Sequence, residues 1–151
     1  MSSSFVYTSL PADVFNGNVK ASDTFRAILC SSAHTPDRLH TKRNQLTNEL
    51  PTANGYTQGG TAVTLSVSTN TSTHRMLLTI GAATWPNSTL TARSLHIVRW
   101  RGGASSADEL VVCITNKDSN GSPADLVSVS STMTWNTPNA TTWEIPLPTP
   151  I

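Results

Sequence analysis

Hydrophobic and polar residues alternate along most of this chain, with the period that places successive side chains on opposite faces of a β-strand. Residues 61–69 carry Val or Leu at positions 63, 65 and 67, with Thr and Ser between them. Residues 75–80 repeat the alternation, and the Asn-Thr-Ser-Thr segment at 70–73 is rich in turn-forming residues. The pattern predicts a β-hairpin built from these two runs.

The same alternation predicts five further strands, at residues 24–31, 91–101, 109–115, 126–135 and 141–145. Residues 40–50 are the one segment that favours a helix, and Pro51 limits it to one or two turns. Short strands at regular spacing, without long helices between them, are typical of sandwiches. We therefore expect an all-β fold, an antiparallel β-sandwich with a short helical segment near residues 40–50.

The inward faces of the predicted strands define an expected hydrophobic core. Each strand contributes the apolar residues of one face, since the other face is rich in Ser and Thr. The expected core consists of Phe25, Ala27, Leu29, Val63, Leu65, Val67, Met76, Leu78, Ile80, Leu95, Ile97, Leu110, Val112, Ile114, Val127, Val129 and Met133.

Length and charge narrow the function classes. The chain has 151 residues, which predicts a single domain, and its formal net charge is only +1. Charged residues make up 13%, whereas Ser, Thr and Asn make up about a third. A near-neutral chain lacks the basic surface that nucleic acids and anionic membranes require, so we expect neither as a partner. The sequence shows no secretory signal and no membrane-spanning run, so we expect a protein that is not exported by that route.

Candidate metal ligands and nucleophiles lack the spacings that known sites use. The four histidines are His34, His40, His74 and His96. No His-Glu-x-x-His, Cys-x-x-Cys or phosphate-loop motif accompanies them. Cys30 and Cys113 lie in strand-like runs, where a buried thiol is the expected state and a single disulfide the alternative. We expect no catalytic residues, no metal and no cofactor, and therefore no enzymatic activity.

Four stretches in a fixed order carry a family resemblance. They are DTFRAIL with SAHTPD at residues 23–37, HTKRNQLTNE at 40–49, GYTQGG at 55–60 and ATWPNSTLTAR at 83–93. Together they resemble a family of small tailed-bacteriophage virion proteins, which carry a "YTPD" turn, an "NEV" segment, a "GYTAGG" turn and a "W.NSTITAR" strand. The resemblance covers about residues 20 to 100, and His34 replaces the usual aromatic residue before the Thr-Pro-Asp turn.

The resemblance implies a virion structural protein. Its closest analogue is a capsid cement or decoration protein, a jelly-roll-like sandwich that clamps neighbouring subunits of the shell. The implied partners are the major capsid protein and a second copy of the chain, as a homodimer or alternatively a trimer. The implied location is the capsid surface of the virion, after assembly in the bacterial cytoplasm. Two alternatives stay open, a tail or baseplate component and a carbohydrate-binding module of the virion.

Both ends of the chain mix apolar residues with polar or Pro spacing, outside the strand pattern. Pro at positions 146, 148 and 150 prevents the C-terminal segment from donating to a sheet and holds it extended. We expect extended arms at residues 1–10 and 146–151, with frayed ends as the alternative. The expected partner-binding residues on these arms are Phe5, Tyr7, Leu147 and Ile151.

Overall fold

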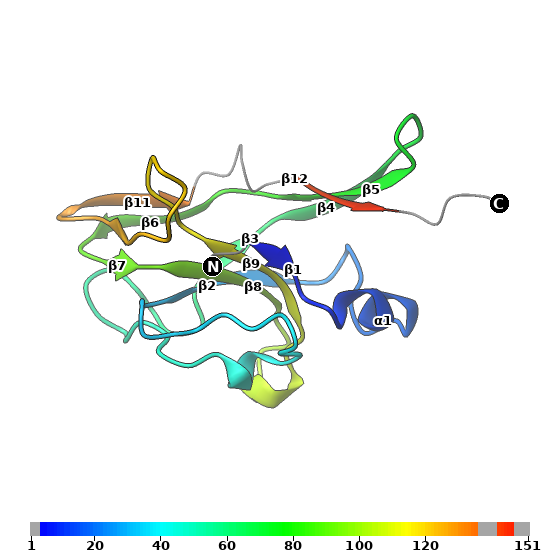
Figure 1. The fold of residues 1–151 in the computed structure, drawn as a ribbon. Coiled ribbons are helices and arrows are strands. Elements are labelled where there is room, and N and C mark those ends of the chain that lie inside the picture. The colour runs from blue at the N-terminus through cyan, green and yellow to red at the C-terminus, as the bar shows by residue number, and fades with distance from the viewer. Residues whose placement is uncertain (1–3, 136–141, 147–151) are drawn as a thin grey trace.

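The computed structural model describes residues 4–135 together with the backbone of residues 142–146. The described chain is all-β and sandwich-like, with two layers of antiparallel strands (Figure 1). The lower layer is a five-stranded sheet of β1 (Phe5–Val6), β9 (Leu110–Thr115), β8 (Ser94–Arg99), β2 (Phe25–Cys30) and β3 (Thr61–Val63), in that order.

The upper layer consists of two smaller sheets. One is the three-stranded sheet of β12 (Thr142–Pro146), β5 (Arg75–Ile80) and β4 (Leu65–Asn70). The other pairs β11 (Ser131–Trp135) with β6 (Ala83–Ser88). A short ladder of β7 (Thr91–Ala92) and β10 (Leu126–Val127) lies near one end (Figure 1). The antiparallel pairing agrees with the predicted fold class.

The predicted hairpin at residues 61–80 is present, but its first strand divides between the two layers. Residues 61–63 pair with β2 in the lower sheet, whereas residues 65–70 pair with β5 in the upper one. The change of layer occurs at Thr64, whose carbonyl accepts a hydrogen bond from Gly81 N–H at 2.9 Å. A Cβ at Gly81 would lie 2.3 Å from Thr64 Oγ1, so a larger residue there would require the Thr64 side chain to move.

The central strands of the lower sheet are buried on both faces, which alternation on one face did not predict. The upper face contributes Phe25, Leu29 and Ile97 to the core between the layers. The lower face carries a second cluster of Phe5, Tyr7, Ile28, Val98, Leu110 and Cys113. This second cluster lies between the sheet and the long segment of residues 31–60, which passes beneath the sheet (Figure 1).

Most of the expected core is confirmed, with two groups of exceptions. Val67, Val127 and Val129 are exposed, so their assignment to the core was wrong. Val67 lies on β4 at the edge of the upper sheet, and the other two lie in and after the two-residue strand β10, where little packs over them. A further group, Val63, Leu65 and Met76, is half-buried.

Helical structure among the described residues is short and consists of three elements, of which one was predicted. A single 3-10 turn at Arg43–Gln45 (η1) lies within the expected segment 40–50. The α-helix α1 (Leu10–Phe15) lies at the end of the expected N-terminal arm. Pro11 near its start and Gly17 just after its end, with φ of +76°, are the residues that favour these positions. A second 3-10 turn, η2 (Ser105–Ala107), lies next to η1.

The N-terminal segment is part of the folded domain and is not an extended arm. Phe5 pairs with Cys113 at the edge of the lower sheet, and Tyr7 N–H donates to the Val111 carbonyl at 3.0 Å. Tyr7 is fully buried and Phe5 is 6% exposed. Neither side chain is free to bind a partner, so the prediction for these two residues was wrong. Their apolar side chains complete the second cluster beneath the sheet, which explains their burial.

Candidate functional site

The stretches that carry the family resemblance meet around one buried tyrosine. The hydroxyl of Tyr56 donates to Glu49 Oε1 at 2.8 Å and accepts a hydrogen bond from Leu29 N–H at 3.1 Å. The same carboxylate oxygen accepts Gly59 N–H at 2.6 Å. The ring of Tyr56 lies 6.0 Å from that of Trp85. Residues from all of these stretches therefore hold one another in place.

The glycines of the GYTQGG stretch allow close approach of backbone, as expected for turn geometry. Gly59 and Gly60 have φ of +92° and +70°. A Cβ on Gly60 would lie 1.8 Å from the Ala27 carbonyl oxygen, and one on Gly59 would lie 2.8 Å from the Trp100 ring. Arg26 donates hydrogen bonds to the carbonyls of both glycines. These residues shape the chain and present no reactive group to solvent.

The tryptophans that the structure describes in full serve packing. Trp85 and Trp135 are buried in the core between the layers. Trp100 is half-buried between the guanidinium groups of Arg26 and Arg43, which lie 4.7 and 4.6 Å from its ring. Tyr7 and Tyr56 are also buried, so no Trp or Tyr side chain in this part of the chain forms an exposed stacking platform.

An apolar groove lies between α1 and the hairpin of β4 and β5. Its volume is about 230 Å³, and its walls include Leu10 and Val14 from the helix and Met76 and Leu78 from β5. Val67 and Val14 are about half exposed at the groove, and Phe15, the last residue of α1, is 92% exposed. Phe15 follows the groove-lining Val14, and apolar surface that is continuous in this way is typical of an interaction surface. This groove together with Phe15 is the candidate docking surface.

A second, polar cavity opens beside the turn after β2. It has a volume of about 360 Å³ and is lined by Ser32, His34, Asp37, Arg93 and Thr115, among others. His34 is the residue before the Thr-Pro-Asp turn that departs from the resembled family, and its side chain is buried at this cavity. Phe5 of the second cluster also lines the cavity, so the cavity borders that cluster.

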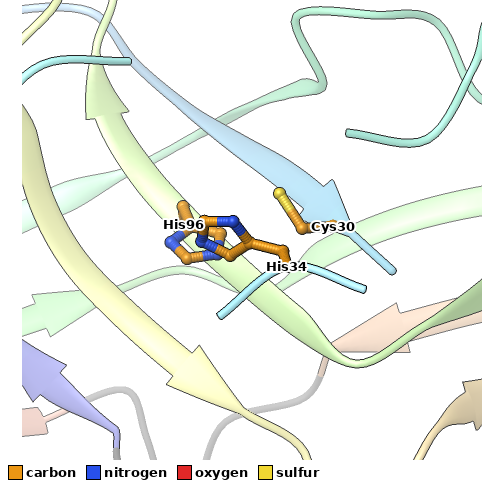
Figure 2. A group of neighbouring side chains, drawn as sticks. All are labelled: Cys30, His34 and His96. Atoms are coloured by element: carbon orange, nitrogen blue, oxygen red, sulfur yellow. The ribbon is translucent and has the colours of Figure 1, made fainter. Parts of the chain in front are cut away.

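Behind His34 lies a buried group of one cysteine and two histidines. Cys30 at the end of β2, His34 from the following loop and His96 from β8 point toward one another (Figure 2). One ligand atom from each residue lies within 4.8 Å of the other two, and all three residues are buried. The rings of His34 and His96 are 4.9 Å apart in an edge-to-face arrangement. We refer to these three residues as the Cys-His-His cluster.

Hydrogen bonds fix the orientation of both imidazoles. His34 Nδ1 accepts a hydrogen bond from Thr47 N–H at 3.3 Å and lies 3.0 Å from Thr47 Oγ1. Its Nε2 is buried with no hydrogen-bond partner among the described residues. His96 Nδ1 lies 2.7 Å from the Tyr7 hydroxyl, and its Nε2 lies 2.9 Å from Ser94 Oγ.

Burial sets the protonation states of the cluster. Removal from water lowers the pKa of His34 and lowers that of His96 further, so both imidazoles are neutral at pH 7. Burial raises the pKa of the Cys30 thiol, and the nearby Glu49 carboxylate raises it further. The pKa of Cys113 is raised to about 12 by burial. None of these groups is therefore charged at neutral pH.

The two thiols are free and buried, as expected. Cys30 and Cys113 lie on β2 and β9, which flank β8 on opposite sides. Strands two positions apart are separated by roughly 9.6 Å, beyond the reach of a disulfide. Cys30 therefore forms no disulfide with Cys113, and its thiol lies beside the two histidines.

No motif in the sequence indicates the Cys-His-His cluster, and we expected no metal ligand in this chain. Cys30 and His34 are close in sequence, but His96 is 62 positions beyond His34 and joins them through the pairing of β2 with β8. Of the expected partner-binding residues, Leu147 and Ile151 lie outside the described residues. The sequence analysis also did not predict the groove at α1, and neither Val14 nor Phe15 was among the expected site residues.

The fold and these sites define an all-β, sandwich-like protein with an apolar surface groove and a buried cluster of potential metal ligands. A comparison with family models, curated proteins and solved structures finds no match. No helix among the residues described by the structure is long and apolar enough to cross a membrane.

Proposed function

We propose that this chain is a non-enzymatic virion structural protein, a cement or decoration protein that binds the major capsid protein of a bacteriophage shell. The family resemblance supports this assignment, and the near-neutral, hydroxyl-rich composition is compatible with many copies packed on one shell. The single observation that carries the binding mechanism is the apolar groove lined by Val14, together with the exposed Phe15 that follows Val14 in α1.

In the proposed mechanism the groove and α1 bind the partner, in place of the N-terminal arm that the sequence predicted. Phe5 and Tyr7 are committed to the interior, whereas Phe15 and Val14 stand at the surface a few residues further along the same segment. Burial of a Phe side chain contributes about 1.5 to 3 kcal/mol, and many weak contacts add up on a shell that presents many sites. We therefore assign shell binding to α1 and the groove.

The alternative functions receive less support from the described residues. A carbohydrate-binding module needs exposed aromatic rings in a groove, and the Trp and Tyr side chains that the structure describes are buried or half-buried. A tail or baseplate component would use the same kind of apolar surface with another partner. The jelly-roll connectivity and the homodimer, with a trimer as the alternative, remain part of the proposal on the resemblance alone.

The test is binding of the purified protein to capsids that lack it, measured by co-sedimentation. We expect saturable binding to shells, and a loss of roughly tenfold or more in affinity for Phe15→Ser. Val129→Ser is the matched control, because Val129 is 70% exposed. The segment between β10 and β11, which carries Val129, lies at the end of the molecule away from α1 (Figure 1).

Each failure of this test has a separate meaning. Binding to purified tails but not to shells would remove the cement assignment and favour the tail alternative. Binding to shells that is unchanged in Phe15→Ser would keep the assignment and remove the groove as its mechanism. Light scattering of the purified protein measures the oligomeric state, and a monomer at all concentrations would contradict the dimer.

A further inference from the structure

We propose that Cys30, His34 and His96 form a binding site for one zinc ion, which ties the loop after β2 to the lower sheet. The inference rests on the side chains of the cluster and is independent of the proposed virion function.

The fold brings the three ligands together from rigid positions. Cys30 lies opposite Ser94 in the pairing of β2 with β8, and His96 is two residues beyond Ser94, on the same face of the sheet. His34 reaches over this face from the loop. Its backbone N–H donates a hydrogen bond to the Ser31 carbonyl at 3.1 Å. Two ligands therefore come from adjacent strands and the third from a turn that begins where β2 ends.

The separations suit a tetrahedral metal after a small contraction. The three ligand atoms lie within 4.8 Å of one another. Zinc bonds of about 2.0 Å to nitrogen and 2.3 Å to sulfur place tetrahedral ligand atoms roughly 3.3 to 3.6 Å apart. Closure of the cluster thus needs movements of about 1 Å or less, which rotation of the His34 and Cys30 side chains can supply.

An unpartnered buried nitrogen points to a ligand at this position. His34 is 4% exposed, and its Nε2 has no hydrogen-bond partner in the described part of the chain. An unsatisfied buried polar atom of this kind costs about 1 to 3 kcal/mol. A metal on Nε2 would satisfy it. The imidazole proton is then on Nδ1, where Thr47 Oγ1 at 3.0 Å can accept it, and this tautomer gives up the hydrogen bond that Thr47 N–H donates to Nδ1 at 3.3 Å.

His96 has the same supporting arrangement. Metal-bound histidines usually donate the second ring N–H to an oxygen, which fixes the ring and the tautomer. The Tyr7 hydroxyl lies 2.7 Å from Nδ1 of His96 and is suited to accept this proton. Coordination through Nε2 then replaces the hydrogen bond to Ser94 Oγ, which lies at 2.9 Å.

The donor set suits zinc and excludes the hard divalent cations. One thiolate and two neutral imidazoles match zinc, whereas calcium and magnesium require oxygen ligands. Coordination replaces the thiol proton of Cys30 with the metal, and that proton leaves to solvent. The polar cavity that His34 lines gives the ion a route to the cluster. The half-buried His40, whose Nδ1 is also unpartnered among the described residues, lies on the same loop with its ring 6.4 Å from that of His34.

Zinc content measured on protein without an affinity tag tests the site. Purified chain is incubated with zinc chloride, dialysed and analysed by elemental mass spectrometry. We expect one zinc per chain in the wild type, and loss of that zinc in Cys30→Ala and in His34→Phe. Phenylalanine keeps an aromatic ring against His96, so this second variant preserves packing while it removes the ligand.

Two variants control for thiol and histidine content. Cys113→Ala removes the other buried thiol, and His74→Asn removes an exposed histidine at a positive φ that asparagine tolerates. Both controls should keep one zinc per chain. Zinc binding that is absent in the wild type, that survives in Cys30→Ala and His34→Phe, or that is lost equally in the controls would overturn the proposal.

Cobalt substitution gives a second readout that does not depend on activity. A cobalt ion bound to Cys30 and the two imidazoles should give a thiolate charge-transfer band in the near ultraviolet and tetrahedral bands in the visible range. Cys30→Ala should abolish the charge-transfer band, while circular dichroism reports that the variant is folded. A wild-type cobalt spectrum of octahedral type, without the thiolate band, would contradict the site.

Discussion

The hydroxyl of Tyr7 lies 2.7 Å from Nδ1 of His96, a residue 89 positions further along the chain. Both residues are completely buried, and the contact joins the segment after β1 to the middle of β8. The first residues of the described chain are therefore part of the second cluster beneath the lower sheet. This contact decides how the N-terminal segment contributes to stability.

Tyr7→Phe should destabilise the protein by about 1 to 3 kcal/mol, because it leaves a ring nitrogen of His96 buried without its partner. The measurement is urea unfolding followed by tryptophan fluorescence. Thr8→Val is the control, since Thr8 is exposed and surface changes of this kind stay within about 0.5 kcal/mol. Equal stabilities of wild type and Tyr7→Phe would mean that the hydrogen bond contributes nothing in solution.

Deletion of residues 1–8 should abolish cooperative folding or lower the melting temperature by many degrees. The deletion removes β1 from the sheet and takes Phe5 and Tyr7 out of the second cluster. A dispensable arm would instead leave the melting temperature unchanged. Differential scanning calorimetry distinguishes these outcomes, and an unchanged transition would restore the arm interpretation.

Much of the fold was predictable from alternation, because a strand with one buried face and one solvent-exposed face alternates apolar and polar residues in its sequence. Strand β5 is an example, because Leu78 and Ile80 are buried and Thr79 between them is exposed. The second cluster was not predictable in this way. Residues 110–115 are buried at every position, so alternation could not divide them between two faces. Strand β6 was not among the strands predicted from alternation for a different reason, because Pro86 argues against a central strand. Among the described strands β6 pairs only with β11, so Pro86 is tolerated on its open side.

The candidate sites depend on contacts between segments far apart in the sequence. No spacing rule joins His96 to Cys30 and His34, because their proximity follows from the register of β2 against β8. Helix α1 has only six residues, too few for a periodic pattern, and so the groove beside it was not expected. The turn at residues 55–60 could be predicted from its glycines. Positive φ angles and close contacts with neighbouring backbone favour glycine at such positions.

The loss of stability on truncating a core residue should depend on how completely that residue is buried. Ile97→Ala should cost about 2 to 5 kcal/mol, because Ile97 is completely buried between the two layers. Leu65→Ala should cost less, roughly 1 to 2 kcal/mol, because Leu65 is half-buried and lines the groove beside α1. Urea unfolding of both variants checks the order. A larger loss for Leu65→Ala than for Ile97→Ala would contradict the described packing.

Gly60→Ala should prevent folding or destabilise the chain by well over ~3 kcal/mol. The new Cβ would lie 1.8 Å from the Ala27 carbonyl oxygen, at a φ of +70°, so that both the backbone of β2 and the turn would have to move. Gly103→Ala is the matched control, because no atom lies within 4 Å of the position that a Cβ would take there. Soluble yield and melting temperature report both effects. A Gly60→Ala protein as stable as Gly103→Ala would contradict the close contact with β2.

Glu109 should make the stability of the protein depend on acidity below pH 4.5. Its carboxylate is 3% exposed, 2.7 Å from Arg101 Nη2 and 3.2 Å from Lys42 Nζ. Burial raises the pKa of Glu109, but the hydrogen bonds from Arg101 and Lys42 outweigh it and hold the pKa below its ordinary value of 4.5. The unfolded chain therefore takes up a proton at this residue at higher pH than the folded chain does.

The sign of the effect follows from that order of protonation. The stabilisation by Glu109 is fully present above pH 4.5 and is lost as the pH falls through the lower pKa of the folded state. Glu109→Gln should cost about 1.5 to 3 kcal/mol at neutral pH, where it removes charge-assisted hydrogen bonds. The difference between variant and wild type should then shrink as the pH is lowered from 4.5. Urea unfolding over this range measures it, and a difference that stays constant with pH would show that the Glu109 carboxylate has the same pKa in the folded and unfolded chains.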